Sequence, residues 1–224
     1  MDIAPYIDHT VLKPILFEKE VEQLCREAGQ FHFAAVCVPP PMVAFSKTKL
    51  GASPVKVATV VGFPFGYSVT SAKLQEIEDA DGQGADEFDT VINLIHLKSG
   101  RLSLLEQEMR ILVQFVHDRK KIIKVIIESG MLSDNEIIDC CKLYGSLGID
   151  YLKTSTGYAE RGASIDAVKL MKKNLPKNVR IKASGGIRSY DFAKQLVEAG
   201  ADRLGCSASV AIINGRPRTE KNAY

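Results

Sequence analysis

The sequence has no long hydrophobic run and no concentration of charge of one sign. No apolar stretch reaches the roughly 18 residues that a membrane-spanning helix needs, and residues 1–5 lack the basic start of a secretion signal. The 29 basic and 27 acidic residues are scattered along the chain, without the electrostatic footprint of a nucleic-acid or anionic-membrane binder. We therefore expect a cytosolic (cytoplasmic) protein that binds neither nucleic acid nor membrane.

The chain also lacks the spacings of disulfide frameworks and metal sites. The five cysteines form no C-x-x-C pair, and the adjacent Cys140 and Cys141 suit an ordinary disulfide poorly. No histidine is placed by the sequence to activate Cys37 or Cys206, so we interpret both as buried small apolar residues. No metal-ligand spacing occurs among His9, His32, His96 and His117. The sequence predicts reduced thiols and no metal.

Two phosphate-binding loops of open α/β sheets are missing as well. The first expected strand is not followed by G-x-G-x-x-G, and no G-x-x-x-x-G-K-[ST] sequence occurs. The chain is instead a regular alternation of short β-branched runs and longer amphipathic stretches. The expected strands are 6–10, 33–38, 56–62, 87–93, 122–128, 151–155, 180–184 and 203–206. The expected helices are 17–28, 41–50, 71–83, 102–119, 134–147, 164–174 and 189–199.

Eight strands alternating with helices predict an α/β fold, a closed (β/α)8 TIM barrel rather than an open doubly wound sheet. A chain of 224 residues can bury one core and is near the compact limit for a barrel. We therefore expect one catalytic domain over residues 1–213, with short loops. Residues 214–224 are expected to form a flexible C-terminal tail.

Several expected helix ends carry capping signals. Glycine follows Ala28, Leu50, Leu147 and Ala199, which predicts that the helices end there. Ser133 with Glu136 three residues later predicts a capping box at the start of another helix.

Chemistry in such a barrel gathers at the carboxyl ends of the strands, where few polar residues occur. These residues are Asp8, Asp89, Asn93, Lys153 and Lys182. The two lysines lie in apolar runs on consecutive strands, where a buried ammonium costs several kcal/mol unless it is paired or neutralised. Two such lysines suggest a chemical role.

Neighbouring strands lie about 4.8 Å apart, so inward-pointing Lys153 and Lys182 disfavour each other's charge. At about 6 Å and an effective dielectric of about 20, the repulsion is roughly 2.8 kcal/mol, or about two pKa units. The neutral fraction of a lysine at pH 7 then rises from about 0.04% to about 4%, and a neutral amine can form a Schiff base. The alternative is a structural ion pair of Lys153 with Asp89, with Lys182 reaching solvent.

A phosphate site is indicated on the last three expected strands. Gly185 and Gly186 follow one strand, and 205–208 (GCSA) leads from the next into a helix, where barrel enzymes bind phosphate through backbone N–H groups. Thr156 and Gly157 follow Lys153 and could add a hydroxyl and an amide. A Gly-Gly pair alone is also ordinary turn chemistry.

Six segments together resemble the 2-deoxyribose-5-phosphate aldolase family, in order and across nearly the whole chain. They are 7–13 (IDHTVLK), 36–39 (VCVP), 61–66 (VGFPFG), 85–89 (ADEFD), 152–157 (LKTSTG) and 181–188 (IKASGGIR). The resemblance implies a carbon–carbon lyase of deoxyribonucleoside catabolism, a class I aldolase without metal or other cofactor. It would reversibly cleave 2-deoxy-D-ribose 5-phosphate to D-glyceraldehyde 3-phosphate and acetaldehyde, as a homodimer or homotetramer paired through outer helices.

The resemblance also assigns roles, carried over by motif. Lys153 would form the Schiff base, Lys182 would lower its pKa, and Asp8 would hold Lys182. Asp89 would move protons through a bound water, and the C-terminal Tyr224 would donate or accept a proton. The phosphate would be bound by Thr156, Gly157, Gly185, Gly186, Ser207 and Ala208.

Two positions depart from the family pattern. Ala208 stands where many members have a serine, which removes one hydroxyl from the phosphate site. Tyr158 stands where some relatives carry a lysine or phenylalanine, so a charged contact to phosphate is missing there. Two other functions stay open: a Schiff-base aldolase for longer sugar phosphates, and a catalytically silent barrel that binds a sugar phosphate.

Overall fold

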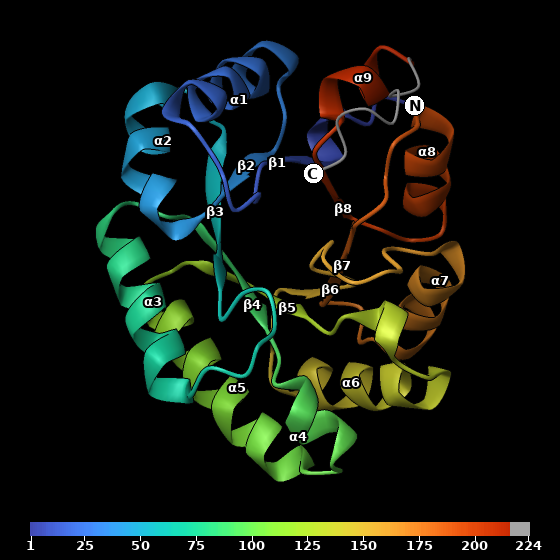
Figure 1. The fold of residues 1–224 in the computed structure, drawn as a ribbon. Coiled ribbons are helices and arrows are strands. Elements are labelled where there is room, and N and C mark those ends of the chain that lie inside the picture. The colour runs from blue at the N-terminus through green and yellow to red at the C-terminus, as the bar shows by residue number, and fades with distance from the viewer. Residues whose placement is uncertain (216–224) are drawn as a thin grey trace.

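Eight parallel strands close into a barrel in the computed structural model, which describes residues 1–215 (Figure 1). Each strand pairs with the next along the chain, and β8 pairs back with β1. The strands are β1 (Ile7–Thr10), β2 (Ala35–Val38), β3 (Lys56–Val61), β4 (Glu87–Val91), β5 (Ile122–Ile126), β6 (Tyr151–Lys153), β7 (Arg180–Ser184) and β8 (Arg203–Cys206). The predicted (β/α)8 barrel is confirmed. The predicted tail, 214–224, lies outside the described residues from 216 onward.

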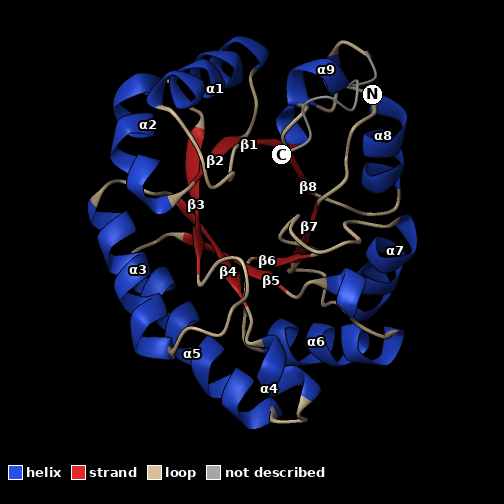
Figure 2. Cartoon of the chain, viewed as in Figure 1, coloured by secondary structure: helices blue, strands red, loops and turns tan. Residues whose placement is uncertain are grey.

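The α-helices surround the barrel as an outer ring (Figure 2). Those of the described residues are α1 (Glu18–Phe31), α2 (Val43–Leu50), α3 (Thr70–Gly82), α4 (Leu94–Lys98), α5 (Leu102–Asp118), α6 (Asp134–Ser146), α7 (Ile165–Asn174), α8 (Tyr190–Glu198) and α9 (Ser209–Ile213). Short 3₁₀ turns lie at Ala4–Tyr6, Pro40–Met42 and Ser129–Met131. The prediction missed α4, which is only five residues long. Asn93, which we expected among the polar residues of the site, caps α4 by accepting from the amide of His96 at 3.2 Å.

The predicted capping signals hold with one exception. Ser133 Oγ accepts from the amide of Glu136, and Glu136 Oε2 accepts from the amide of Ser133, which forms the predicted capping box. The predicted end of α1 at Ala28 is wrong, because the helix continues through Gly29 to Phe31. His32 takes the left-handed conformation instead, with φ of 54°, and the amide of Phe33 closes the turn on the carbonyl of Ala28.

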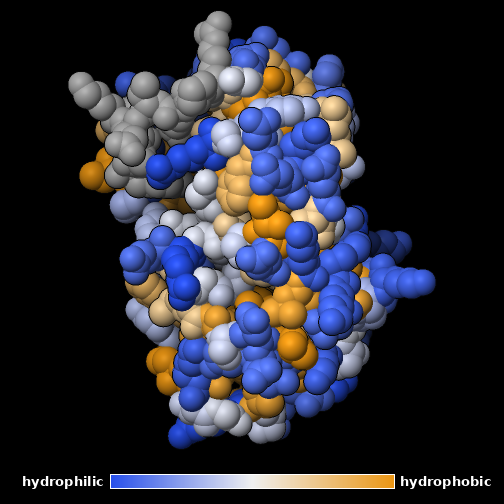
Figure 3. Space-filling model, turned by 90° about the vertical axis from the view of Figure 1, so that its right-hand side faces the viewer, coloured by the Kyte–Doolittle hydropathy of each residue, from blue (hydrophilic) through white to orange (hydrophobic). Residues whose placement is uncertain are grey.

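The outer surface mixes polar and scattered apolar side chains, as one face shows in Figure 3. Among residues 1–215, none of the helices has the length and apolar character that crossing a membrane requires. All five cysteines are buried, and none forms a disulfide.

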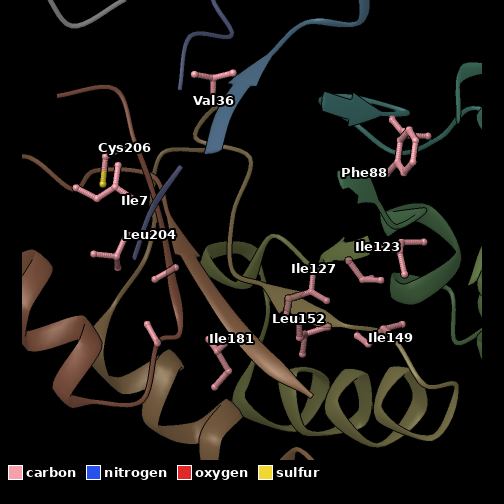
Figure 4. Close-up of a cluster of buried hydrophobic side chains, with 14 of the residues drawn as sticks. Ile7, Val36, Phe88, Ile123, Ile127, Ile149, Leu152, Ile181, Leu204 and Cys206 are labelled. Carbon is pink, nitrogen blue, oxygen red and sulfur yellow. The ribbon is translucent and has the colours of Figure 1, made fainter. Parts of the chain in front are cut away.

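Strand residues alternate between an apolar layer under the helices and the barrel interior. Ile7, Phe88, Ile123, Leu152 and Ile181 are fully buried in the outer layer, part of which Figure 4 shows. Their chain neighbours point to the opposite face of the sheet, because successive strand residues alternate. On β2 and β3 the inner residues Ala35, Cys37, Ala58 and Val60 are apolar, and they form a second cluster with Leu12 from the loop after β1. On the other strands the inner face carries charged residues.

Candidate active site

Lys153 and Lys182 lie side by side in the interior, on β6 and β7. They are register partners in the β6–β7 pair, and their exposed fractions are 2% and 0%. Both amines donate to one atom, Asp89 Oδ2, at 2.7 Å from Lys153 and 2.6 Å from Lys182. The structure therefore brings together the three residues that the sequence placed at these strand ends. Of the structural alternative, the ion pair of Lys153 with Asp89 is present, but the expectation that Lys182 reaches solvent is wrong.

Asp89 on β4 is the shared carboxylate of three lysines. Its other oxygen, Oδ1, accepts from Lys124 on β5 at 2.7 Å. Burial alone would raise the pKa of Asp89, but the ammonium groups of Lys124, Lys153 and Lys182 together hold it well below its ordinary value. Asp89 is therefore held as an anion around which the lysines are organised.

Asp8 on β1 holds Lys182 from the other side, as the family resemblance implied. Lys182 donates to Asp8 Oδ2 at 2.5 Å, and Arg203 on β8 donates to Asp8 Oδ1 at 2.6 Å. Burial acts to lower the pKa of Lys182, but the carboxylates of Asp8 and Asp89 outweigh it, so the pKa is raised. Lys182 is thus kept as a cation.

Lys153 responds to burial in the opposite way. Its pKa is lowered, chiefly because burial disfavours the charged amine; Lys182 adds repulsion, and Asp89 opposes both. The repulsion between the two lysines, which the sequence argument took as the main cause, is therefore the smaller contribution. Within this set of lysines, Lys153 is the amine best placed to be a neutral nucleophile.

Three buried charged residues of the site were missed from the sequence: Glu87, Lys124 and Arg203. Lys124 pairs with Glu87 Oε2 at 2.6 Å and with Asp89, and Arg203 reaches Glu87 at 3.4 Å. Arg203 also donates to the hydroxyl of Tyr151 at 3.3 Å. The signal was present in the alternation of the strands, because Glu87 is two residues before Asp89 and Lys124 stands between Ile123 and Val125.

Glycines of the expected phosphate site meet in the backbone junction after β6 and β7. Gly185 packs against Gly157 and Gly162, and Gly186 has open space beside it. Gly157, Gly185 and Gly186 have φ values of 92°, 86° and 75°, which favour glycine. A Cβ on Gly185 would lie 3.1 Å from the Cα of Gly162 and 3.4 Å from the Cα of Gly157. Ser207 and Ala208 follow β8 directly and lead into α9. Backbone can approach a ligand closely in such a junction.

Thr156 is engaged by a residue that the sequence did not indicate. Its hydroxyl donates to Glu128 Oε2, and its amide lies 3.3 Å from both Glu128 oxygens. Glu128 follows β5 and is buried; burial raises the pKa of its carboxyl although Thr156 lowers it. The Thr156 hydroxyl therefore faces a carboxyl in this structure, and its role toward phosphate stays a prediction.

One departure from the family pattern and one predicted site residue remain, Tyr158 and Tyr224. Tyr158 extends to the loop after β1, where its hydroxyl donates to the carbonyl of Leu12 at 2.6 Å. Tyr224 lies outside the described residues. Within residues 1–215, no three His, Cys, Asp or Glu side chains form a group that could hold a metal ion.

Comparisons of the sequence point to one family. Residues 3–215 match the model of the DeoC/LacD family of aldolases. A deoxyribose-phosphate aldolase of Treponema denticola is 42% identical over 216 residues, which is 96% of this chain and 100% of that protein. One from Streptococcus pneumoniae is 46% identical over 215 residues, 96% of this chain and 97% of that protein.

Solved structures agree with the sequence comparisons. A putative deoxyribose-phosphate aldolase from Coccidioides immitis superposes with a TM-score of 0.91 at 40% identity, covering 95% of this chain and 85% of that one. The tetrameric deoxyribose phosphate aldolase from Aeropyrum pernix gives a TM-score of 0.87 at 31% identity, covering 95% and 89%. The resemblance seen in the six segments is confirmed, and the chain belongs to the DeoC/LacD family of aldolases.

Proposed function

We propose that this protein is a class I deoxyribose-phosphate aldolase in which Lys153 is the nucleophile. The reaction is the reversible cleavage of 2-deoxy-D-ribose 5-phosphate to D-glyceraldehyde 3-phosphate and acetaldehyde. The observation that carries the proposal is the arrangement of three buried lysines on Asp89, in which the pKa of Lys153 is lowered while those of Lys124 and Lys182 are raised. One amine is thus available to react, while the amines of Lys124 and Lys182 stay protonated.

The first step is the attack of the neutral Lys153 amine on the C1 carbonyl of the open-chain sugar. Loss of water gives a protonated imine, which has a positive nitrogen and a single N–H. Asp89 Oδ2, already 2.7 Å from Lys153 Nζ, is placed to accept that N–H and to stabilise the new charge. The buried site supports this step because few waters compete for the imine.

The second step breaks the bond between C2 and C3. A base removes the proton of the C3 hydroxyl, C3 becomes the aldehyde carbon of glyceraldehyde 3-phosphate, and the bonding electrons move into the imine to form an enamine. Protonation of C2 and hydrolysis then release acetaldehyde and restore the Lys153 amine. We assign the proton transfers to a water held by Asp89, the carboxylate beside Lys153, as the family resemblance implies.

The phosphate end anchors the substrate. We assign it to the junction of Gly157, Gly185 and Gly186 with the Ser207–Ala208 turn. Binding energy from this remote group holds C1 over Lys153, so loss of the phosphate should lower turnover as well as affinity. The Glu128 carboxyl beside Thr156 disfavours a phosphate contact to that hydroxyl unless Glu128 is protonated.

Assembly, cofactor and compartment remain predictions. We propose a homodimer or homotetramer, because the related aldolase from Aeropyrum pernix is a tetramer and α5 of this chain exposes Leu102, Leu104 and Ile111. Light scattering of the purified chain measures the subunit number. The imine mechanism needs no metal or other cofactor, and a cytoplasmic location fits its sugar phosphate substrate.

The function is tested by a coupled assay of glyceraldehyde 3-phosphate release from 2-deoxyribose 5-phosphate. The proposal predicts rapid cleavage of this substrate and little cleavage of longer ketose phosphates. Preference for the ketose phosphates would favour an aldolase of a different substrate class. Binding of deoxyribose phosphate without any turnover would favour the silent binder.

Replacing Lys182 by leucine should slow imine formation and move its pH dependence upward. The positive charge of Lys182 helps to lower the pKa of Lys153, so its removal raises that pKa and reduces the neutral fraction at pH 7. A rise of about one pH unit corresponds to about a tenfold slower reaction below the midpoint. The rate of cyanoborohydride trapping of acetaldehyde between pH 5 and 9 measures the change. An unchanged profile would show that Lys182 does not tune Lys153.

Deletion of Tyr224 should slow proton exchange at the enamine carbon and leave phosphate affinity nearly unchanged. The family resemblance assigns this tyrosine to proton transfer, which is distinct from anchoring of the phosphate. Deuterium exchange into the methyl group of acetaldehyde, followed by NMR, measures the effect. Equal exchange rates in the full and shortened chains would remove Tyr224 from the mechanism.

A further inference from the structure

Six of the charged side chains inside the barrel form a closed ring of alternating sign, which we call the charge ring. Its members, in order around the ring, are Asp8, Lys182, Asp89, Lys124, Glu87 and Arg203. They come from strands β1, β7, β4, β5 and β8, so the ring exists only because the barrel is closed.

One half of the charge ring contains the groups next to the reactive amine. Lys182 bridges Asp8 Oδ2 and Asp89 Oδ2 at 2.5 and 2.6 Å, and Lys124 continues from Asp89 Oδ1 at 2.7 Å. The two oxygens of Asp89 therefore serve different cations. Its orientation is fixed from both sides.

The other half closes the ring away from the reactive amine. Lys124 binds Glu87 Oε2 at 2.6 Å, Glu87 lies 3.4 Å from Arg203, and Arg203 returns to Asp8 Oδ1 at 2.6 Å. All six residues are buried, and the most exposed of them is Arg203, at 9% of the residue. Each carboxylate thus contacts at least two ring cations, and each cation at least two ring carboxylates; Lys124 also lies 3.7 Å from Asp8 Oδ2, across the ring.

The charges of the ring cancel without Lys153. Three carboxylates and three cations give no net charge. Lys153 is not a member of the ring, and it pairs with the same Asp89 oxygen, Oδ2, as Lys182 does. A proton on Lys153 adds an uncompensated positive charge to a buried site, which is costly, whereas a neutral amine leaves the site balanced.

We propose that the charge ring, by cancelling its own charges, lets burial keep Lys153 neutral, and that Glu87, Lys124 and Arg203 are positioning residues for the aldolase reaction. They act through Asp89 and Asp8. This inference deepens the proposed function and rests on Lys153 being the nucleophile. It predicts that residues which do not touch the substrate affect the rate of imine formation on Lys153.

Other titratable groups could also affect the protonation of Lys153. Cys37 on β2 and Cys206 on β8 have thiol pKa values raised by burial, in the case of Cys206 to about 12, so both are neutral at pH 7. Glu128, after β5, directs its carboxyl to the hydroxyl and amide of Thr156. Glu128 is unchanged in every variant below, so differences between variants report on the ring.

The test compares two substitutions of opposite charge sign. Glu87→Gln removes a negative charge from the ring, and Lys124→Met removes a positive one while keeping much of the side-chain bulk. The measured quantity is the pH midpoint of the initial rate at which acetaldehyde is trapped on Lys153 by cyanoborohydride, with the trapped residue identified by peptide mass spectrometry. We expect the midpoint to fall by about one pH unit in Glu87→Gln and to rise by about one in Lys124→Met.

The double variant Glu87→Gln/Lys124→Met has a neutral ring again, and its midpoint should return to the wild-type value. A merely structural role would damage both single variants in the same direction and the double variant further. Arg203→Gln also removes one positive charge and must shift the midpoint upward. It replaces Lys124→Met in the comparison if Lys124→Met does not fold.

A matched control is the buried pair of Lys73 on α3 with Glu108 on α5, which lies outside the barrel interior. Its atoms are 2.7 Å apart, as close as those of the ring pairs. Lys73→Met and Glu108→Gln should lower stability and leave the midpoint unchanged. Unshifted midpoints in the ring variants, with normal trapping in the wild type, would overturn the proposal that the charge ring affects the protonation of Lys153. Absence of trapping on Lys153 in the wild type would instead contradict the proposed function.

Discussion

Replacing Lys153 by alanine abolishes both cleavage of deoxyribose phosphate and covalent trapping of acetaldehyde, and lowers kcat by at least about a thousandfold. No neighbouring amine can substitute, because Lys182 and Lys124 are each held as cations between two carboxylates. The measurement is the coupled cleavage assay, with trapping followed by intact-protein mass spectrometry.

Lys153→Met is the companion variant, since it keeps most of the side-chain volume and loses only the amine. It should be as inactive as Lys153→Ala while folding more like the wild type. Lys73→Met, which removes a buried lysine outside the site, should retain turnover. Substantial activity in either Lys153 variant would contradict the assignment of the nucleophile.

Replacing Asp89 by asparagine separates the two halves of the reaction. Removal of the negative charge beside Lys153 favours the neutral amine, and the amide oxygen of asparagine can still accept the imine N–H, so imine formation with acetaldehyde should persist at pH 7. Cleavage should fall by about a hundredfold to ten-thousandfold, because asparagine cannot move protons. The trapping rate measures imine formation and the coupled assay measures cleavage, both on the same preparation of the variant.

The same variant should also be less stable. Three lysines lose their common anion, and breaking a buried pair costs about 3–5 kcal/mol of unfolding free energy. Urea unfolding at the temperature of the kinetic assays measures this loss. It also shows whether the variant is folded during those assays. Parallel loss of trapping and cleavage in folded protein would show that Asp89 acts on the imine step itself.

The barrel could be predicted because its signals are local. Each strand is a short β-branched run, and each helix has its own periodicity and caps. The end of α1 was missed because the left-handed turn is taken by His32 and not by a glycine; Phe31 and Phe33, on either side of it, stack on each other. The short helix α4 has too few residues to show a period.

The site could be predicted only in part, for a geometric reason. Lys153 and Lys182 were identified because adjacent strands carry them at the same level. The contacts of Arg203 with Asp8 and of Glu128 with Thr156 depend on the closure of the barrel and on loop conformation. Lys124 is the register partner of Asp89, so the comparison of strand levels could have found it, whereas Glu87 is the first residue of β4 and lies away from the carboxyl end.

The barrel interior therefore has two parts with different tasks. The side of β2 and β3 is apolar, through residues such as Ala35, Cys37 and Ala58. The remaining strands carry buried charges that hold one another. An isolated charge of this kind would destabilise the fold, whereas the closed ring compensates its members and leaves a single amine without a carboxylate of its own.

The most direct measurement is the location of the ethyl group that cyanoborohydride leaves after the protein reacts with acetaldehyde at neutral pH. The account predicts one ethyl group per chain, on Nζ of Lys153, with Lys182 and Lys124 unmodified. An ethyl group on Lys182 or Lys124 in place of Lys153, or an unmodified protein under conditions in which it cleaves deoxyribose phosphate, would contradict it.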